Sequence, residues 1–206
     1  MLEDKTFLDI LGIIRQKSTC SFFKTGALVV KENRIVSMGY NGTPSGFPQC
    51  NELQEVLEYV RDQRESLSIK FGSNAREIIP ILKDKFSYFK RYSSDFLKFF
   101  EEKLIESLEG ILNLQDEPDL YKVNFLHSRY EIHAEQNALA FSLKAGTNIA
   151  GSTLYTSLLP CMECAKLIVA AGIKRVVYVD EYEDKRFRES SVKFLKINGV
   201  LVEKGG

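Results

Sequence analysis

Two short stretches set the strongest constraint on how this chain folds, a His-Ala-Glu stretch beginning at His133 and a Pro-Cys-Met-Glu-Cys stretch ending at Cys164. One imidazole and two thiolates are enough to bind a zinc ion, and three protein ligands leave its fourth position open, as in catalytic sites. We therefore expect the fold to bring His133, Cys161 and Cys164 to one point. Glu135 lies two residues beyond the histidine, close enough to act on a water at the metal without binding the metal itself.

The local sequence explains how these ligands would be presented. Pro160 is typical of the position just ahead of a helix, and Cys161 and Cys164 would then lie one turn apart on the same helix face. The positive end of the helix dipole favours thiolate over thiol, and thiolate is the form that binds metal. His133 begins a second predicted helix, residues 133–144. The alternative, a capping histidine and two buried apolar cysteines, does not explain why all these residues occur together.

The composition narrows the class of protein. Lys plus Arg and Asp plus Glu balance at 28 each, which gives no global reason to expect a nucleic-acid or membrane partner. The first residues lack the pattern of a signal peptide, and no apolar run approaches the roughly 18 residues of a membrane span. Four cysteines without a secretory signal favour metal binding or reactive thiols over disulfides. We therefore expect a cytoplasmic protein.

The hydrophobic pattern predicts a sheet covered by helices. Residues 2–18 form an amphipathic helix with a stripe of Leu2, Phe7, Leu11 and Ile14. An antiparallel hairpin follows, with a two-residue turn at Glu32-Asn33. The two strands of the hairpin are expected at 26–31 and 34–40. Three later strands are expected at 152–156, 175–179 and 200–202, and helices at 133–144, 161–171 and 186–196. This alternation of strand and helix implies a sheet that is at least partly parallel.

The segment from residue 52 to 126 has a different composition, because half of the 14 phenylalanines lie in it among long charged side chains. We interpret it as an insertion of about three helices, buried against the core domain or another subunit. Asn74 or Ser73 is a candidate cap for one helix and Ser93 or Ser94 for another, and Pro80 is expected in a first turn or at a kink. The residues expected to share one helical face are Phe89, Tyr92, Phe96 and Phe99, continued by Leu104, Leu108, Ile111 and Leu112.

Four motifs together resemble the cytidine-deaminase superfamily, and within it the deoxycytidylate (dCMP) deaminases of bacteria and phages. They are Gly39-Tyr40-Asn41-Gly42-Thr43-Pro44, His133-Ala-Glu-Gln-Asn-Ala, Leu159-Pro-Cys-Met-Glu-Cys-Ala-Lys and Ala171-Gly-Ile-Lys-Arg-Val-Val-Tyr. The resemblance implies a single domain over 1–206, with a three-layer α/β/α fold, a central five-stranded mixed sheet and a helical insertion at 52–126. It also implies hydrolysis of dCMP to dUMP and ammonia, which feeds dTMP synthesis. In that reaction a zinc-activated water attacks C4 of the base while Glu135 carries protons.

The same resemblance implies the substrate contacts. Asn41 would bond the deoxyribose 3′-hydroxyl, Lys24 and Tyr182 would lie near the 5′-phosphate, and the backbone NH of Ala134 would contact the pyrimidine. The residues themselves leave alternatives open: Asn41 as a turn residue, Lys24 as a solvated charge and Tyr182 as a packed surface aromatic.

A second, structural zinc is also implied by the resemblance to phage members, with Cys20, Cys50, His127 and Glu131 as ligands. This set would use every cysteine and histidine that the catalytic site leaves over. The alternative is two buried thiols, an exposed histidine and a glutamate at a helix entry.

The family further implies regulation and assembly. Family members are often hexamers, with dCTP and dTTP bound as effectors near subunit contacts, so we expect a homo-oligomer, hexamer or dimer. The residues that would lie there are Gly39, Gly42, Phe141 and Lys144. Competing hypotheses are deamination of dCTP, or of a base in tRNA or single-stranded DNA, and a zinc-bound scaffold or DNA-uptake accessory protein without catalysis. The balanced charge argues against a polynucleotide channel, and the intact Glu135 argues against lost catalysis.

Overall fold

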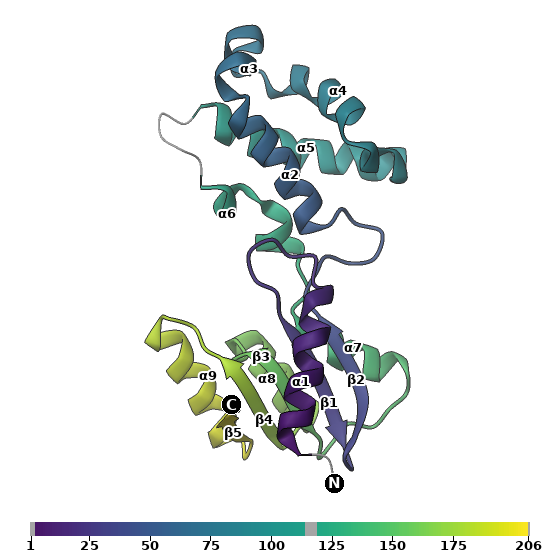
Figure 1. Cartoon of the computed structure of the whole chain (residues 1–206), viewed down its shortest axis with the longest axis vertical. Helices are drawn as coiled ribbons and strands as arrows, with labels where there is room; N and C mark the ends of the chain where they lie inside the picture. Colours follow the sequence, from purple (N-terminus) through teal and green to yellow (C-terminus); the bar gives the residue numbers. More distant parts are fainter. Residues whose placement is uncertain (1–2, 114–118, 206) are drawn as a thin grey trace. The chain divides into compact units, whose positions relative to one another are not determined.

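The computed structural model describes residues 3–113 and 119–205, which divide into two compact units (Figure 1). Unit 1 comprises Met1–Ser18, Phe23–Gly42 and Ile132–Gly206. Unit 2 comprises Thr19–Phe22 and Thr43–Glu131. Unit 2 therefore contains the whole of the segment expected as an insertion, and it extends beyond that segment at both ends.

Unit 1 is built on a five-stranded sheet in the order β2-β1-β3-β4-β5. The strands are β1 (Gly26–Lys31), β2 (Arg34–Tyr40), β3 (Thr153–Leu158), β4 (Arg175–Asp180) and β5 (Leu201–Lys204). β1 pairs antiparallel with both β2 and β3, whereas β3, β4 and β5 run parallel. The hairpin turn has positive φ at Glu32 and Asn33, as two-residue hairpin turns require. The predicted mixed sheet and its hairpin are confirmed.

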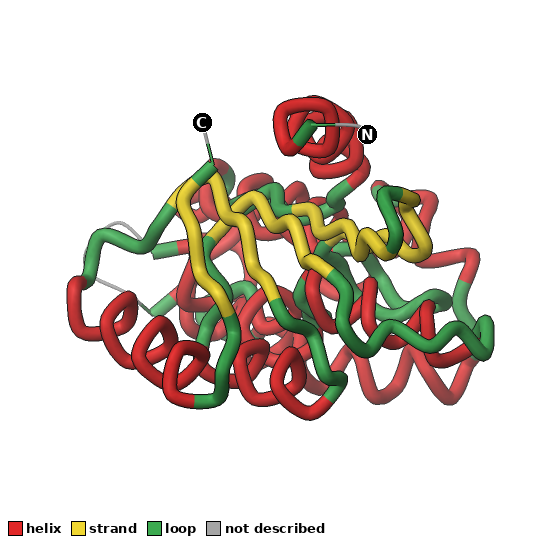
Figure 2. The backbone as a smooth tube through the Cα atoms, turned by 90° about the horizontal axis from the view of Figure 1, so that it is seen from below, coloured by secondary structure: helices red, strands yellow, loops and turns green. Residues whose placement is uncertain are grey.

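Helices cover both faces of this sheet (Figure 2). Helix α1 (Asp4–Ile14) packs on one face, where Phe7 and Leu11 meet Leu28 of β1. The other face is covered by α7 (Ala134–Lys144), α8 (Met162–Ala170) and α9 (Lys185–Ile197). Successive side chains of β1 alternate between these two cores, as the pleat of a strand dictates. The predicted three-layer α/β/α fold is confirmed; of the predicted stripe of α1, Leu2 lies outside the described residues.

The element boundaries in unit 1 agree with the sequence expectation to within a residue or two, except that α1 ends early and continues as a 3₁₀ turn, η1 (Arg15–Lys17). One small difference matters for the site. The expected helices began at His133 and Cys161, but α7 and α8 begin one residue later. Both residues have extended backbone, with ψ of 154° and 172°, which is the conformation of a residue that precedes a helix.

A polar network fastens α1 to the sheet. Arg175 Nη2 lies 2.5 Å from Asp4 Oδ2, and its Nε lies 2.6 Å from Glu203 Oε2. The Tyr155 hydroxyl donates to Asp4 Oδ1 at 2.5 Å. The hydrogen bonds from Arg175 and Tyr155 lower the pKa of Asp4 to about 2.

Unit 2 is helical and has its own apolar core. Its elements are α2 (Cys50–Asp62), α3 (Arg64–Phe71), α4 (Ala75–Lys85), the 3₁₀ turn η2 (Ser87–Arg91), α5 (Ser94–Leu112), α6 (Leu120–Val123) and the π turn η3 (Leu126–Tyr130). This exceeds the three or so helices expected, because Gln63 leaves the helical conformation between α2 and α3, and Gly72 ends α3 with a φ of +62°. The segment has an apolar core among its own helices, while Ile69, Tyr121 and Phe99 stay exposed. Its expected burial against the core domain or another subunit stays a prediction.

The expected aromatic face is not the face of a single helix. Ser93 Oγ accepts from the NH of Phe96 and caps α5, so Phe89 and Tyr92 precede that helix. Their rings still contact it, with centroids of Tyr92 and Phe96 at 5.3 Å and of Phe89 and Phe100 at 5.9 Å. The leucines and isoleucine expected to continue the face are buried.

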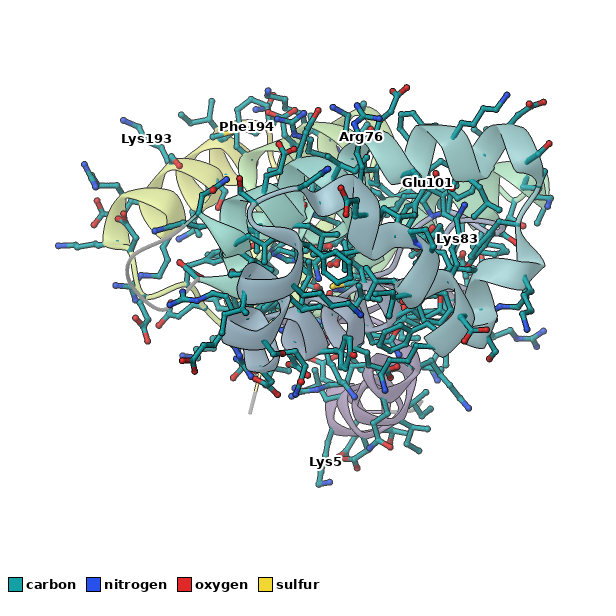
Figure 3. All side chains as sticks on the ribbon, turned by 90° about the horizontal axis from the view of Figure 1, so that it is seen from above. Lys5, Arg76, Lys83, Glu101, Lys193 and Phe194 are labelled. Atoms are coloured by element: carbon teal, nitrogen blue, oxygen red, sulfur yellow. The ribbon has the colours of Figure 1, made fainter. Side chains whose placement is uncertain are left out.

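Helix α4 narrows the alternatives that the sequence left open for its cap and its proline. Asn74 immediately precedes the helix, and its Nδ2 donates to Glu77 Oε1 at 2.8 Å. Pro80 lies in the body of α4, which excludes the first turn and leaves the other expected position, a kink within the helix. Lys83 of α4 forms an ion pair with Glu101 of α5 (Figure 3). None of the helices in the described part of the chain combines the length and the apolar character needed to cross a lipid bilayer.

Candidate active site

The fold brings His133, Cys161 and Cys164 together in unit 1. Nδ1 of His133 lies 3.5 Å from Cys161 Sγ and 3.4 Å from Cys164 Sγ. All three ligand atoms lie within 4.8 Å of one another. Tetrahedral zinc with ordinary bond lengths separates a bound nitrogen and sulfur by about 3.5 Å. The donor set and its spacing therefore fit a zinc ion with one position left for a non-protein ligand.

Two helix starts present these ligands. His133 immediately precedes α7, and its NH is held by Gln136 Oε1 at 3.0 Å. Cys161 immediately precedes α8, and Cys164 lies buried in the first turn. The hydrogen bond from Cys164 lowers the pKa of Cys161 to about 4, and His133 adds to this against the effect of burial. The same bond raises the pKa of Cys164. These contacts favour the thiolate form of Cys161, and thiolate is the form that binds a metal.

Glu135 lies beside this cluster but does not belong to its ligand set. It is only 6% exposed, in the first turn of α7. Burial raises the pKa of its carboxyl group. Two side chains of the described residues hydrogen-bond it: Cys164, and Thr156 of β3, whose Oγ1 lies 3.4 Å from Glu135 Oε1. A buried carboxyl group with a raised pKa is suited to take up and release a proton.

The start of α7 is held against β2 by close backbone packing. A Cβ at Gly39 would lie 2.4 Å from both Ala134 O and Ala138 N, so only glycine allows this approach. The hydroxyl of Ser37 donates to Ala138 O at 2.6 Å, and Nδ2 of Asn137 donates to Tyr40 O at 2.7 Å. Gly39 was expected at an effector site; its position in the fold gives it a packing role.

Gly42 and Ile132 extend this contact. They exchange two backbone hydrogen bonds, of 3.2 Å from Gly42 N and 2.9 Å from Ile132 N. The chain that enters α7 is therefore paired with the chain that leaves β2. Because His133 follows Ile132 directly, this pairing fixes the approach of the histidine ligand to the metal site.

Asn41, which follows β2, is buried and engaged with the backbone. Its Oδ1 accepts from Thr25 N at 2.8 Å, and its Nδ2 donates to Phe23 O at 2.7 Å. Both neighbours of Lys24 are thus fixed by one side chain, while Lys24 itself is exposed.

The other expected substrate and effector residues lie in unit 1 as well. Ala134 is the first residue of α7, where NH groups have no acceptor within the helix. Tyr182 is partly buried in the segment between β4 and α9. Phe141 is 58% exposed near the end of α7, and Lys144 is the exposed last residue of that helix.

A second cluster, Cys20, Cys50, His127 and Glu131, lies wholly in unit 2, with its ligand atoms also within 4.8 Å of one another. Cys20 Sγ lies 3.4 Å from His127 Nδ1, which lies 3.1 Å from Glu131 Oε2. Burial lowers the pKa of His127, but the bonds to Cys20 and Glu131 outweigh it and raise that pKa to about 9. The hydrogen bond with Cys20 lowers the pKa of Cys50. Four thiolate, imidazole and carboxylate donors at this spacing fit a closed zinc site.

Sequence reasoning missed Thr156 and Asn124. Thr156 is fully buried on β3 and faces Glu135; the alternation of β3 around a buried leucine, Leu154, is the signal that would have placed it on the α7 side. Asn124 is fully buried and donates to Cys50 O at 3.2 Å. No pattern around Asn124 distinguishes it from a loop residue.

Comparison with known proteins gives a consistent picture. The family model for the cytidine and deoxycytidylate deaminase zinc-binding region matches residues 1–180. The chain is 29% identical over 185 residues to deoxycytidylate deaminase of Enterobacteria phage T2, covering 90% of this chain and 84% of the relative. It is also 29% identical over 178 residues to deoxycytidylate deaminase of Mycobacterium phage D29, covering 86% and 94%. Among solved structures, dCMP deaminase from the cyanophage S-TIM5, in complex with dCMP and dUMP, matches with a TM-score of 0.58 and 25% identity over the full length of both chains.

Proposed function

Because this chain belongs to the cytidine and deoxycytidylate deaminase family, we propose that it hydrolyses dCMP to dUMP and ammonia, a reaction that feeds dTMP synthesis. The observation that carries the proposal is the convergence of His133, Cys161 and Cys164 with a buried Glu135 beside them. The likeness to relatives named for this reaction supports dCMP as the substrate.

The chain's own residues divide the chemistry between them. Bound at His133, Cys161 and Cys164, zinc would supply Lewis-acid activation of a water molecule at neutral pH. Glu135 takes one proton from the water and delivers it to the ring nitrogen of the base, and it then carries the second proton, from the new hydroxyl at C4, to the departing amino group. Water adds at C4 and ammonia leaves from C4, so the two protons of the water end on the ring nitrogen and on the ammonia.

We assign substrate contacts to four residues. Ala134 offers its backbone NH to the pyrimidine, and Asn41 offers its side-chain amide to the deoxyribose 3′-hydroxyl. Lys24 and Tyr182 are assigned to the 5′-phosphate. The support is that Lys24 is exposed on a segment whose backbone Asn41 holds on both sides.

We also propose that Cys20, Cys50, His127 and Glu131 hold a second, structural zinc. Four ligands close the coordination sphere and leave no position for substrate. They come from three separate stretches of unit 2, so a metal there would cross-link this unit.

Assembly and regulation complete the proposal. We expect a homo-oligomer, dimer or hexamer, with dCTP and dTTP as effectors at the end of α7. The exposed ring of Phe141 and the cation of Lys144 support this location, and Gly39 and Gly42 shape the adjoining strand. Light scattering with and without each nucleotide tests it, because an effector that shifts the assembly would change the measured mass.

One assay tests the function. Release of ammonia and formation of the uracil product would be measured with dCMP, dCTP, CMP, deoxycytidine and a cytosine-containing oligonucleotide. We expect turnover of dCMP to exceed that of the others, and Glu135→Ala to abolish it. Preferred turnover of dCTP or of the oligonucleotide would replace the proposed substrate, and equal turnover by Glu135→Ala would refute the mechanism.

A further inference from the structure

A hydroxyl group from the sheet reaches the buried carboxyl group of the site. Thr156 is fully buried in the fourth position of β3. Its Oγ1 lies 3.4 Å from Glu135 Oε1 and 3.0 Å from the carbonyl oxygen of Leu158. The Thr156 hydroxyl therefore stands between a fixed backbone acceptor and the carboxyl group that carries the protons in the proposed function.

A hydroxyl has the hydrogen-bonding capacity that this position needs, because it can both donate and accept. When Glu135 is ionised, Thr156 donates its hydrogen to the carboxylate. When Glu135 carries the proton, Thr156 turns its hydrogen to Leu158 O and accepts from the carboxylic acid.

We propose that Thr156 is the positioning residue of the proton-carrying Glu135, holding its carboxyl group in one orientation through the hydrogen bond from β3. The inference rests on the proposed function, since it concerns the same site. Strand β3 would then contribute a side chain that positions Glu135, in addition to leading the chain to the cysteine pair.

Paired substitutions separate this role from a structural one. Thr156→Val keeps the shape of the side chain and removes the hydroxyl, whereas Thr156→Ser keeps the hydroxyl. We expect Thr156→Val to lower kcat on dCMP about ten- to a hundredfold, the range for losing a hydrogen bond to a charged group, with KM within about twofold of the wild type. Thr156→Ser is expected to recover most of the lost kcat. Zinc content per chain should stay unchanged in both.

Ser142→Ala is the matched control. Ser142 is buried on α7, and its hydroxyl donates to the backbone oxygen of Leu139 at 2.7 Å. This variant also removes a buried hydroxyl from unit 1, so its thermal midpoint should fall in a similar way while kcat stays unchanged. If Thr156→Val does not fold, the kcat of Thr156→Ala is compared with that of Thr156→Ser at a lower temperature instead.

Each outcome decides something. A zinc-loaded Thr156→Val, or its Ala replacement, with the kcat of the wild type would overturn the role of Thr156 and leave the proposed function standing. A rise in KM with an unchanged kcat would also overturn it. So would a loss of kcat in Thr156→Val that Thr156→Ser shows as well. A wild-type protein without turnover of dCMP would overturn both proposals.

Discussion

The two candidate metal clusters use the same side-chain types, but the carboxylate is a ligand in one and lies outside the ligand set in the other. In unit 2, Glu131 lies 3.1 Å from the His127 nitrogen and completes a set of four ligands. In unit 1, Glu135 lies outside the set of three and is held by Thr156. The position of one carboxylate therefore distinguishes a closed site, where a metal would stabilise the fold, from an open site, where a metal-bound water could hydrolyse a substrate.

The clusters also differ in how they are built from the chain. The ligands in unit 1 precede or begin two helices that already pack on the sheet. The ligands in unit 2 come from three stretches: the Thr19–Phe22 segment, the start of α2, and the π turn η3 together with the residue that follows it. We therefore expect metal loss to impair mainly activity in unit 1 and mainly stability in unit 2.

The largest effect should come from exchanging each glutamate for glutamine. Glu135→Gln removes the proton carrier and should lower kcat on dCMP by about 10²- to 10⁴-fold, because that is the contribution of general acid–base catalysis. Its zinc content, measured by mass spectrometry of the metal, should remain that of the wild type. Glu131→Gln should instead lose zinc and keep most of its kcat while it stays folded. Loss of zinc in Glu135→Gln would contradict the distinction between the two carboxylates.

The next effect concerns thermal stability. Cys50→Ser should lower the thermal midpoint by about 5–10 °C, as expected when a buried cross-link in a domain of this size is lost. Cys161→Ser should also lose about one zinc per chain, but with a smaller shift of the midpoint and no activity. Calorimetry together with metal analysis checks both variants. A Cys50→Ser protein with unchanged zinc and an unchanged midpoint would remove the second site.

The sequence predicted these two regions unequally, for physical reasons. His133, Cys161 and Cys164 were predictable because short-range spacing and helix starts determine how they point. The mixed sheet was predictable because its hydrophobic alternation is regular. The helices of unit 2 were not, since their number depends on local breaks at Gln63 and Gly72.

Contacts between distant segments were the least predictable part of the site. The bond from Thr156 to Glu135 depends on which face of β3 meets α7. The two backbone bonds of Asn41 depend on where the segment after η1 runs. Neither follows from spacing along the chain, because each joins residues that only the tertiary fold brings together.

A smaller effect should come from the packing of α7 on β2. Gly39→Ala places a Cβ 2.4 Å from two backbone atoms of α7, which should destabilise unit 1 by about 1–3 kcal/mol. Gly12→Ala on α1 is the control, because its Cβ meets nothing within 4 Å and alanine favours a helix. Denaturation and metal analysis should show that Gly39→Ala keeps the zinc of unit 2. A Gly39→Ala protein as stable as Gly12→Ala would show that α7 is not held by this contact.

The smallest effect should come from Asp4, which stabilises unit 1 without any metal. The pKa of Asp4 is lowered to about 2 by Arg175 and Tyr155, against about 3.9 in an unfolded chain. Its contribution is therefore present above pH 4 and is lost as the pH falls towards 2. Since the side chain is 43% exposed, we expect Asp4→Asn to cost about 1 kcal/mol or less at pH 7.

Asp9→Asn on the same helix is the control, because its pair with Lys5 is largely exposed. Urea denaturation between pH 7 and pH 2.5 should show the difference between wild type and Asp4→Asn shrinking as the pH falls, and the difference at pH 7 should survive chelation of the metals. A difference that grows towards low pH, or that vanishes with the metals, would mean that unit 1 too depends on its metal for stability.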